Sequence, residues 1–485
     1  MMLMVCRSDV VRQTVQQERI MLFSSLTFLY LFLPLLILVY FLSPKPLRNL
    51  VLLLFSLVFY GWGEPKYLAL ILVSISAGYL SGLVLSKIKN KSHSRMAAAA
   101  FVVVILGMLA YFKYADFVIS TVNGVFHADI PLLRLALPIG ISFYTFQILS
   151  YTIDVYRGQT EVQKNPIDFA AYVVLFPQLI AGPIVRYRDI AAELRHRQCG
   201  IDMACSGAQR FVIGLGKKVL LANQLGILVE AYYSSAEPTV LFAWLAAIAY
   251  LFQIYLDFSG YSDMAIGLGR IFSFHFPENF NYPFLSVSVT EFWRRWHMTL
   301  GAWFRDYVYI PLGGNRVKKL RWLFNILVVW CLTGLWHGAG WNFLLWGLFF
   351  AVLLMIEKLW ILKFLERRRW FGHIYVILAL LFSFVLFRSN SMTQFTADLR
   401  AMLQPGNLPG FNTESLYHLR SSLGLLVLSA VASTPLGGLV AKELDNSRFA
   451  SVFAWTKPFL LAALLVLCTA FLVDGSFNPF LYFRF

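Results

Sequence analysis

The chain has 485 residues, of which 59% are hydrophobic and only 14% are charged, and its mean hydropathy is +0.67. Soluble domains usually contain about 25% charged residues, so this composition excludes an ordinary soluble protein and predicts several membrane-spanning helices. The formal net charge of +16 would suit a nucleic-acid-binding protein. The chain has no basic tail, no long polar domain and no recognition motif. We therefore expect no nucleic-acid partner and attribute the charge to basic cytoplasmic loops beside membrane lipids.

Apolar runs of helical length recur along the whole chain and predict eleven or more membrane spans. The runs cover residues 22–42, 48–61, 67–86, 96–112, 132–153, 239–256, 321–336, 341–361, 373–387, 421–439 and 457–473. Three further segments, 168–184, 207–230 and 261–273, are interrupted by glycine, proline or charged residues, which fits short spans, re-entrant segments or interfacial helices. The predicted fold class is an all-α polytopic membrane protein of about 11–13 transmembrane helices.

Basic residues between the first spans predict the orientation. Lys45 and Arg48 lie in the first connection and four basic residues lie in segment 87–95, and positive charge marks cytoplasmic loops. The first span would then begin outside, which leaves the basic residues of segment 1–20 on the wrong side. We interpret 1–20 as an N-terminal extension, a misplaced start or a dispensable leader, and 21–485 as one transmembrane domain.

The central region, about 138–345, concentrates polar residues among aromatic ones, whereas the flanks are mostly aliphatic. Ionisable groups at membrane depth are costly and usually functional. We therefore predict a catalytic core at 138–345, with scaffold helices at about 21–115 and 373–475.

His297 closes segment 291–297 (EFWRRWH). As one helix, 293–307 would place Trp296, His297 and Phe304 on an aromatic face, with three arginines projecting elsewhere. Two interpretations fit this pattern. The helix either lies at the membrane interface, with its arginines at lipid headgroups and an incidental histidine, or lines a cytoplasm-facing cavity where the arginines hold phosphates. The basic loop 316–321 that follows is most simply a cytoplasmic anchor.

His337 lies in segment 332–339 (LTGLWHGA), between two apolar stretches. Glycines on both sides interrupt a helix, so we expect a helix junction at the wall of a cavity. A structural histidine bonded to a backbone carbonyl is the alternative. Histidine is the side chain best suited to moving protons near neutral pH, which favours a functional role.

Two more polar segments have simple alternatives. Asp257 and Asp263, with Ser259 between them, form either a paired acid site or a cap and turn at the end of a span. Gln178 is the one polar side chain of segment 176–183, which has a proline near each end and resembles a re-entrant turn.

Several kinds of site have no motif in the chain. Signatures of nucleotide-binding loops, dinucleotide folds, zinc peptidases and serine hydrolases are missing. The five cysteines form no C-x-x-C pair, so we expect reduced thiols and no metal site. This expectation includes Cys199 and Cys205, which lie near His196.

Five ordered motifs together resemble the bacterial membrane-bound O-acyltransferase (MBOAT) family, closest to the branch of alginate O-acetyltransferase and the peptidoglycan O-acetylation membrane subunit. They are 138–143 (PIGISF), 177–183 (PQLIAGP), 257–263 (DFSGYSD), 293–297 (WRRWH) and 335–339 (LWHGA). The resemblance implies a ring of helices around a thinned centre, with a cytoplasmic funnel for the acyl donor. It also implies that His337 is the principal catalytic histidine and His297 the second one. In the mechanism that fits these residues, His337 accepts a proton from the attacking hydroxyl or takes the acyl group itself, and His297 orients the donor or stabilises the oxyanion.

The resemblance further implies acetyl-coenzyme A as donor substrate, no bound cofactor, and a periplasmic partner that is an SGNH-type acetyltransferase or an acetyl-acceptor protein. The location would be the bacterial inner membrane. We expect polar and aromatic side chains of the central region to bind the substrates: Arg294, Arg295, Trp296, Trp303, Arg305, Gln178, Asp257, Ser259, Asp263 and Asn279.

The predicted function is O-acetylation of an exported or cell-wall polysaccharide. Two alternatives stay open. One is D-alanyl transfer to teichoic acid, which needs a carrier-protein donor. The other is a transporter of polysaccharide or lipid intermediates without chemistry of its own, although the chain lacks paired interruptions in two halves.

Overall fold

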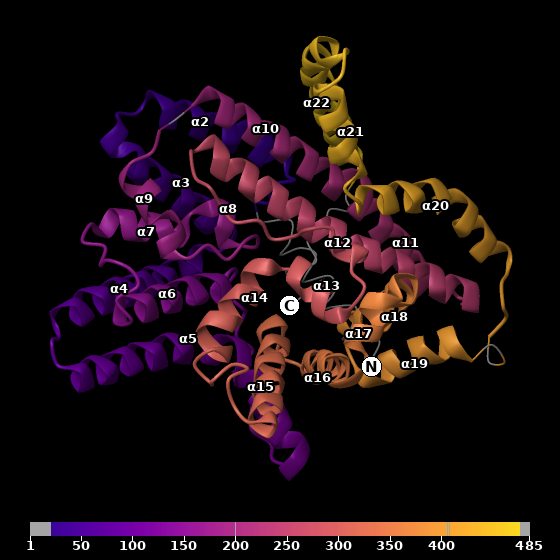
Figure 1. Ribbon diagram of the computed structural model, residues 1–485, viewed down its shortest axis with the longest axis horizontal. Coiled ribbons are helices and arrows are strands. Elements are labelled where there is room, and N and C mark those ends of the chain that lie inside the picture. Colours follow the sequence, from indigo (N-terminus) through magenta and orange to yellow (C-terminus); the bar gives the residue numbers. More distant parts are fainter. Residues whose placement is uncertain (1–20, 199, 405, 407, 476–485) are drawn as a thin grey trace. The chain divides into compact units, whose positions relative to one another are not determined.

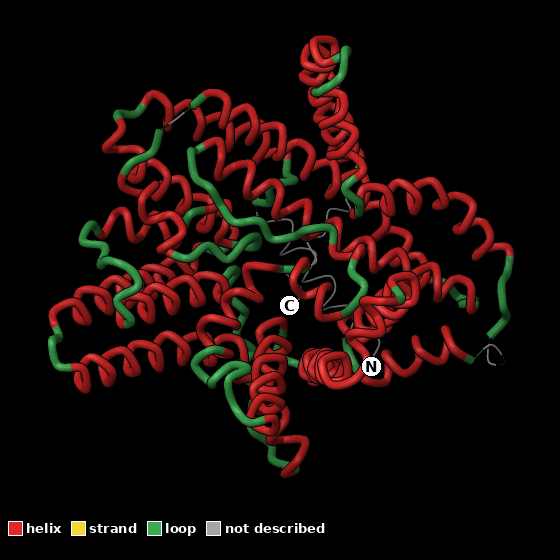
Figure 2. Tube along the Cα trace, viewed as in Figure 1, coloured by secondary structure: helices red, strands yellow, loops and turns green. Residues whose placement is uncertain are grey.

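The computed structural model describes residues 21–198, 200–404, 406 and 408–475, and these form helices joined by loops, with no strand among them (Figures 1 and 2). The predicted all-α fold class is confirmed. Residues 1–20, interpreted above as an extension, and Cys199 lie outside the described residues.

Nine helices within the described ranges are long and apolar enough to cross a membrane. They are Lys45–Gly63, Pro65–Lys87, Lys91–Phe126, Ile201–Ser234, Val240–Ile271, Lys319–His337, Arg369–Arg388, Thr413–Ala432 and Ala450–Asp474. This number is below the predicted count because several apolar runs form shorter helices. The run at 132–153 is helical only over Ile141–Tyr156, and the run at 341–361 forms Trp341–Ile356 followed by a π-helical turn.

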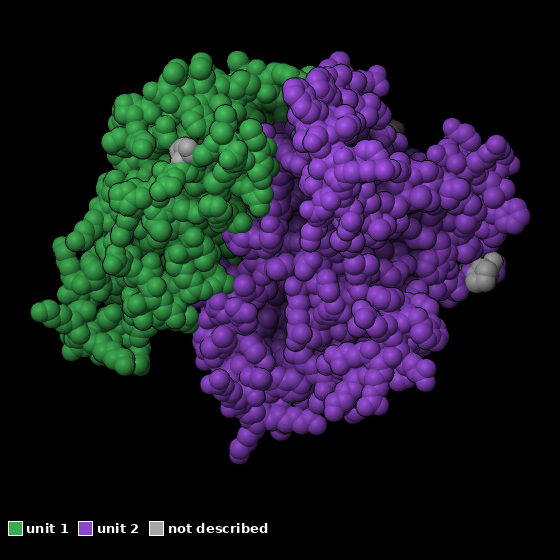
Figure 3. Space-filling model, turned by 45° about the horizontal axis from the view of Figure 1, so that its top comes forward, with its two compact units in different colours: residues 1–207, 268–276 green, residues 208–267, 277–485 purple. Residues whose placement is uncertain are grey.

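The described residues form two compact units, coloured separately in Figure 3. The first unit comprises residues up to 207 and 268–276. Its helices are η1 (Phe28–Phe32), α2 (Leu33–Leu42), η2 (Lys45–Leu47), α3 (Arg48–Gly63), η3 (Pro65–Tyr67), α4 (Leu68–Lys87), α5 (Lys91–Phe126), α6 (Ile141–Tyr156), α7 (Pro166–Val174), α8 (Phe176–Leu179) and α9 (Tyr187–Arg195). All four residues of α8 are buried, so the apolar segment 168–184 is packed inside this unit as two short helices.

The second unit comprises residues 208–267 and those from 277 onward. Its helices are most of α10 (Ile201–Gly216), η4 (Lys217–Ala222), α11 (Asn223–Ser234), α12 (Val240–Ile271), η5 (Pro283–Leu285), α13 (Val289–Arg295), α14 (Met298–Phe304), η6 (Arg305–Tyr309), α15 (Lys319–His337), α16 (Trp341–Ile356), η7 (Glu357–Ile361), α17 (Leu362–Arg367), α18 (Arg369–Arg388), α19 (Met392–Leu403), α20 (Thr413–Ala432), α21 (Leu436–Asp445) and α22 (Ala450–Asp474). Both predicted catalytic histidines lie in this unit.

Two glycine contacts bring helix backbones of the second unit together. A Cβ atom at Gly334 or Gly347 would overlap backbone atoms of the facing helix, so α15 and α16 touch directly. A Cβ atom at Gly214 or Gly260 would similarly overlap the backbone across the α10–α12 crossing. Small residues are the usual means of close helix approach in membrane proteins. These crossings set the positions of the polar residues described next.

Candidate active site

His297 lies at a break between two short helices. Helix α13 ends at Arg295, Trp296 is extended, and His297 has a left-handed backbone (φ +43°) before α14 begins at Met298. The prediction of one helix over 293–307 is therefore wrong. The backbone here pairs with a loop instead, since Met298 N donates to Asn279 O at 3.0 Å and Asn281 N donates to Arg295 O at 2.9 Å. These tertiary hydrogen bonds override the helical pattern of the side chains.

A hydrogen-bond network orients the His297 ring. Its Nδ1 lies 3.0 Å from Oδ1 of Asn279, and the Thr299 hydroxyl donates to the same oxygen at 2.9 Å. The amide nitrogen of Asn279 donates to Ser262 Oγ at 3.1 Å. An amide oxygen only accepts hydrogen bonds, so Nδ1 carries the proton and Nε2 is the unprotonated nitrogen.

Burial also keeps His297 neutral. The side chain is 1% exposed, and this desolvation lowers the pKa of His297 to about 3. At neutral pH, Nε2 of this ring is therefore able to accept hydrogen bonds and donates none. Of the two roles predicted for His297, this geometry fits orientation of the donor better than stabilisation of an oxyanion.

His337 is the last residue of α15, and extended Gly338 ends the helix. The predicted helix junction at this histidine is confirmed. Its ring packs against Trp336 and Trp346 with centroids 5.0 Å away in each case, and against Phe387 at 5.3 Å. The direct contact of α15 with α16 places Trp346 beside this histidine.

The two histidines contact one indole. The His297 ring lies 5.7 Å from the Trp336 ring, which also contacts His337. Phe258 of α12 packs edge-on against His297 with centroids 4.8 Å apart. Both imidazoles, forty residues apart in sequence, thus belong to one buried aromatic cluster. Their catalytic roles stay a prediction.

The two carboxylates of α12 are separately paired. Asp257 bonds Lys218 Nζ at 2.6 Å with both side chains buried, and Asp263 bonds Lys217 Nζ at 2.8 Å and Arg210 at 2.9 Å. Neither alternative predicted from sequence holds. They do not form a paired acid site, and α12 continues past Gly260 without a cap or turn, because Gly260 packs on Gly214 inside a helix crossing.

A cavity of about 450 Å³ borders the His297 network. It is lined by Arg210, Lys217, Tyr255, Ser259, Ser262, Asp263, Ile266, Glu278, Asn279, Phe280, Asn281, Tyr282 and Met298. Ser259, Asp263 and Asn279 were predicted as substrate-binding residues, and the structure brings these three together. Arg210 and Lys217 were missed, although charged residues inside the apolar segment 207–230 were a visible signal.

The remaining predicted residues of the second unit are placed differently. Trp296 is buried against Phe280 and Phe292, and Trp303 is buried against Tyr307. Substrate binding by these two residues stays a prediction. Arg294 is exposed. Arg295 pairs with Glu291 at 2.8 Å and the exposed Arg305 with Asp306 at 2.7 Å.

Gln178 belongs to the first unit. It is fully buried in α8, and its amide nitrogen donates to the Tyr172 backbone oxygen at 2.7 Å. This bond gives Gln178 a local structural role, and substrate binding by it stays a prediction. In the described part of the chain, no three His, Cys, Asp or Glu side chains lie close enough to hold a metal ion.

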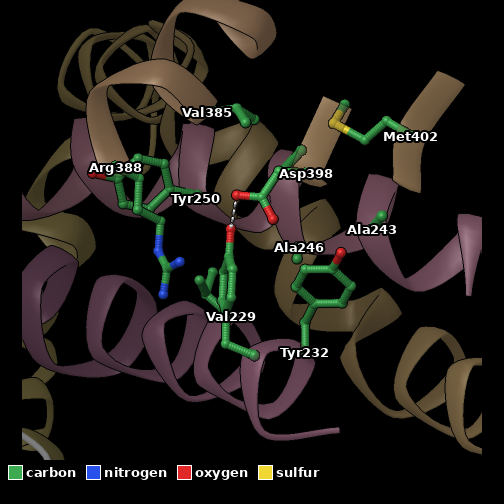
Figure 4. A pocket seen from close by; sticks show the side chains of 11 residues that line it. Val229, Tyr232, Ala243, Ala246, Tyr250, Val385, Arg388, Asp398 and Met402 are labelled. Atoms are coloured by element: carbon green, nitrogen blue, oxygen red, sulfur yellow. Dashed lines mark hydrogen bonds between the residues drawn. The ribbon is translucent and has the colours of Figure 1, made fainter. Parts of the chain in front are cut away.

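A second, much smaller cavity of about 10 Å³ lies among α11, α12, α18 and α19 (Figure 4). Tyr233 donates to Asp398 at 3.0 Å, and the Arg388 guanidinium lies 3.6 Å from the Tyr233 ring centroid. Burial raises the pKa of Asp398. This space holds about one water molecule, so we do not consider it a substrate site.

Comparison with known proteins identifies the family. Residues 6–393 match the sequence profile of the MBOAT, membrane-bound O-acyltransferase, family. The chain is 38% identical to the probable alginate O-acetylase AlgI of Azotobacter vinelandii over 96% of this chain and 100% of that protein. The probable alginate O-acetylase AlgI of Pseudomonas aeruginosa is 41% identical over 84% of this chain and 80% of its own length. The peptidoglycan O-acetyltransferase of Helicobacter pylori is 31% identical over 96% and 98%.

The family resemblance carried by the five motifs is thereby confirmed over most of the chain. The apolar helices of both units agree with a multi-pass membrane protein. The chain belongs to the membrane-bound O-acyltransferase family and is a membrane-bound O-acyltransferase.

Proposed function

We propose that the protein is an O-acetyltransferase that uses cytoplasmic acetyl-coenzyme A to O-acetylate an exported or cell-wall polysaccharide, alginate-like or peptidoglycan. The names of the relatives from Azotobacter vinelandii and Helicobacter pylori support this substrate class. The observation that carries the proposal is the contact of both histidines with Trp336 inside one buried cluster. Proton transfer by a positioned imidazole is the chemistry such a cluster provides.

In the proposed reaction, an acceptor hydroxyl attacks the carbonyl carbon of the acetyl thioester. A C–O bond forms and the C–S bond breaks. His337 takes the proton from the hydroxyl and returns it to the departing thiolate, so that the thiol and the acetyl ester are the products. We assign the proton transfer to His337 because burial lowers the pKa of His297 to about 3, which makes that ring a weak base at neutral pH.

His297 has a different proposed task. Its Nε2 accepts a hydrogen bond from an N–H or O–H group of a substrate and so holds the thioester in line for attack. Fixed geometry of this kind lowers the barrier because the reacting atoms are already oriented. Asn279 and Thr299 keep the ring in this orientation.

The coenzyme A phosphates are proposed to bind exposed cations near the site. Arg294 and the basic residues of segment 316–321, within which α15 begins at Lys319, are exposed, and arginine suits phosphate oxygens because it presents several N–H groups in a planar fork. Positive charge is also typical of cytoplasmic loops. This agrees with a donor that arrives from the cytoplasmic side of the inner membrane.

A periplasmic partner is proposed to receive the acetyl group, either an SGNH-type acetyltransferase or another acceptor protein, and to pass it to the polymer. The cytoplasmic donor and the exported acceptor lie on opposite sides of the membrane, which is why a membrane-embedded site is needed.

The test compares cells that carry the wild-type gene, no gene, or His337→Ala. Acetyl esters on wall and exopolysaccharide are measured by mass spectrometry, and purified protein in lipid discs is incubated with labelled acetyl-coenzyme A and an acceptor, either the polysaccharide or the periplasmic partner protein. We expect acetylation to be lost without the gene and in the variant. Full acetylation in the His337→Ala strain, or failure of the purified protein to consume acetyl-coenzyme A, would contradict the proposal. Consumption of a D-alanyl carrier protein instead would indicate D-alanyl transfer.

A further inference from the structure

Arg210 of α10 joins two segments that meet at the cavity. Its Nε donates to Asp263 Oδ1 of α12 at 2.9 Å, and its Nη1 donates to Glu278 Oε1 of the following loop at 2.6 Å. One guanidinium thus bridges two carboxylates from different elements. Hydrogen bonds in which both groups are charged are the strong ones, and the planar fork fixes their directions.

A second link runs parallel to this bridge. Ser262 and Asn279 directly neighbour Asp263 and Glu278 in sequence, and the Asn279 amide donates to Ser262 Oγ at 3.1 Å. The loop is therefore tied to α12 at two successive residues. The other end of the Asn279 amide accepts the proton of His297 Nδ1.

The α10–α12 crossing fixes the position of Arg210. Gly214, four residues later, meets Gly260 at backbone contact, and Lys217 pairs with Asp263 at 2.8 Å. Arg210 and Lys217 thus lie seven residues apart, two turns along one helix face, and reach the same carboxylate. The position of Asn279 is consequently tied to a rigid crossing of two long helices.

The charges in the cavity offset one another. Its two cations, Arg210 and Lys217, are bonded to its two carboxylates, Asp263 and Glu278. A guanidinium engaged by two carboxylates is poorly placed to hold a phosphate, because the ligand would have to displace them. These contacts assign Arg210 to the support of the loop rather than to the binding of an anionic donor.

We propose that Arg210 is a positioning residue for His297. By holding Glu278 against Asp263, it keeps the Asn279 carbonyl on His297 Nδ1 and so maintains the tautomer whose Nε2 accepts a hydrogen bond. Without the guanidinium, Glu278 loses the two charged hydrogen bonds that tie its loop to α10 and α12, and the loop that carries Asn279 moves. This inference rests on the proposed function, because its kinetic readout is acetyl transfer.

The experiment is a double-mutant cycle on the full-length protein in lipid discs with labelled acetyl-coenzyme A. Arg210→Gln and Asn279→Ala are each expected to lower kcat about 10–100-fold, the usual effect of losing a supporting hydrogen bond. The double variant should lose no more than Asn279→Ala alone, because Arg210 acts through Asn279. The KM for acetyl-coenzyme A should stay within about twofold of wild type. Arg448→Gln, at an exposed arginine before α22, is the matched control.

A second readout does not depend on activity. Nitrogen NMR of protein labelled at histidine reports which ring nitrogen of His297 carries the proton, with His297→Asn used for assignment. We expect one tautomer in the wild type and a mixture in Arg210→Gln. The tautomer can be measured without any substrate. It therefore tests the positioning role of Arg210 even if the proposed donor, acetyl-coenzyme A, is wrong.

Three results would overturn the inference. They are additive losses in the double variant, a raised KM with unchanged kcat, and an unaltered His297 tautomer in Arg210→Gln. If Arg210→Gln does not accumulate in the membrane, Glu278→Gln serves in the same cycle. Glu278→Gln keeps the arginine but removes one of its charged partners. We expect it to lower kcat less than Arg210→Gln does, and to cause no further loss of kcat when it is added to Asn279→Ala.

Discussion

The surroundings of the two histidines differ sharply although both rings contact Trp336. His297 is held by polar groups, with Asn279 on its Nδ1 and a left-handed backbone. His337 ends a helix and packs against the rings of Trp346 and Phe387. A polar partner fixes a tautomer, whereas ring packing fixes a position. This contrast is the basis of the proposed division of roles, in which His297 orients a substrate and His337 moves the proton.

The largest expected effect tests the role of His337. His337→Ala should lower the rate of acetyl transfer by about 10²–10⁴-fold, the usual contribution of a general acid–base group. The assay is turnover of labelled acetyl-coenzyme A by purified protein in lipid discs. His93→Ala, at an exposed histidine near the start of α5, is the control and should match the wild type. A loss below about tenfold would contradict the assignment of His337 as proton acceptor.

A change at Asn279 tests the role of His297. In Asn279→Asp a carboxylate faces Nδ1, and a nearby negative charge raises the pKa of a histidine. As the pH falls through the raised value, Nε2 gains a proton and stops accepting a hydrogen bond, so the rate should fall at acidic pH. A neighbouring charge shifts a pKa by about 1–3 units and that of His297 starts at about 3, so we expect a loss of up to about fourfold at pH 5.5 relative to wild type. The measurement is kcat from pH 5.5 to 8.5, with the exposed Asn446→Asp as control. Identical profiles for the two variants would show that the neutral ring is not needed.

A third change tests whether packing positions His337. A Cβ atom at Gly347 would overlap the backbone of α15 at Trp330, so Gly347→Ala should push α15 and α16 apart. Overpacking of this kind costs about 1–3 kcal/mol. Thermal unfolding in detergent and acetyl transfer should both show the loss. Gly424→Ala in α20 is the control, because nothing lies within 4 Å of its Cβ position. Equal melting temperatures for Gly347→Ala and Gly424→Ala would contradict the expected overlap between α15 and α16.

The smallest effect concerns the pH dependence of stability. The pKa of His297 is lowered to about 3 in the fold, whereas an exposed histidine has a pKa of about 6.5. Below pH 6.5 the unfolded chain binds a proton that the folded chain does not, so stability is present above this pH and is lost as the pH falls. Between pH 7.5 and 5.5 the melting temperature should fall more for wild type than for His297→Asn. Asparagine is chosen because it tolerates the left-handed backbone. Parallel curves would contradict the neutral buried state.

Sequence alone predicted the fold class and the helix end at His337 well. Long apolar runs are direct signals of spans, and the glycines around His337 indicated the end of α15. The break at Trp296 could not be predicted, because the aromatic spacing of 293–307 fits a helix and the competing partners are backbone groups at Asn279 and Asn281.

The charged pairs were missed for a related reason. Lys218 with Asp257, and Arg210 with Asp263, are partners about forty and fifty residues apart. They meet because Gly214 and Gly260 allow α10 and α12 to touch. A glycine inside an apolar run does not indicate which helix it will face, so the pairing follows from tertiary structure.

Helix α22 has a consequence for handling the protein. Only 6% of its apolar stretch is buried within the part of the chain that the structure describes, and Leu464 on it lies next to Gly216, the residue just before Lys217. Annular lipid must therefore cover most of this helix, and a short-chain detergent that strips the lipid would loosen it from the lysine-bearing π-helical turn. Preparations extracted gently, with native lipid retained, should be the ones that keep their activity.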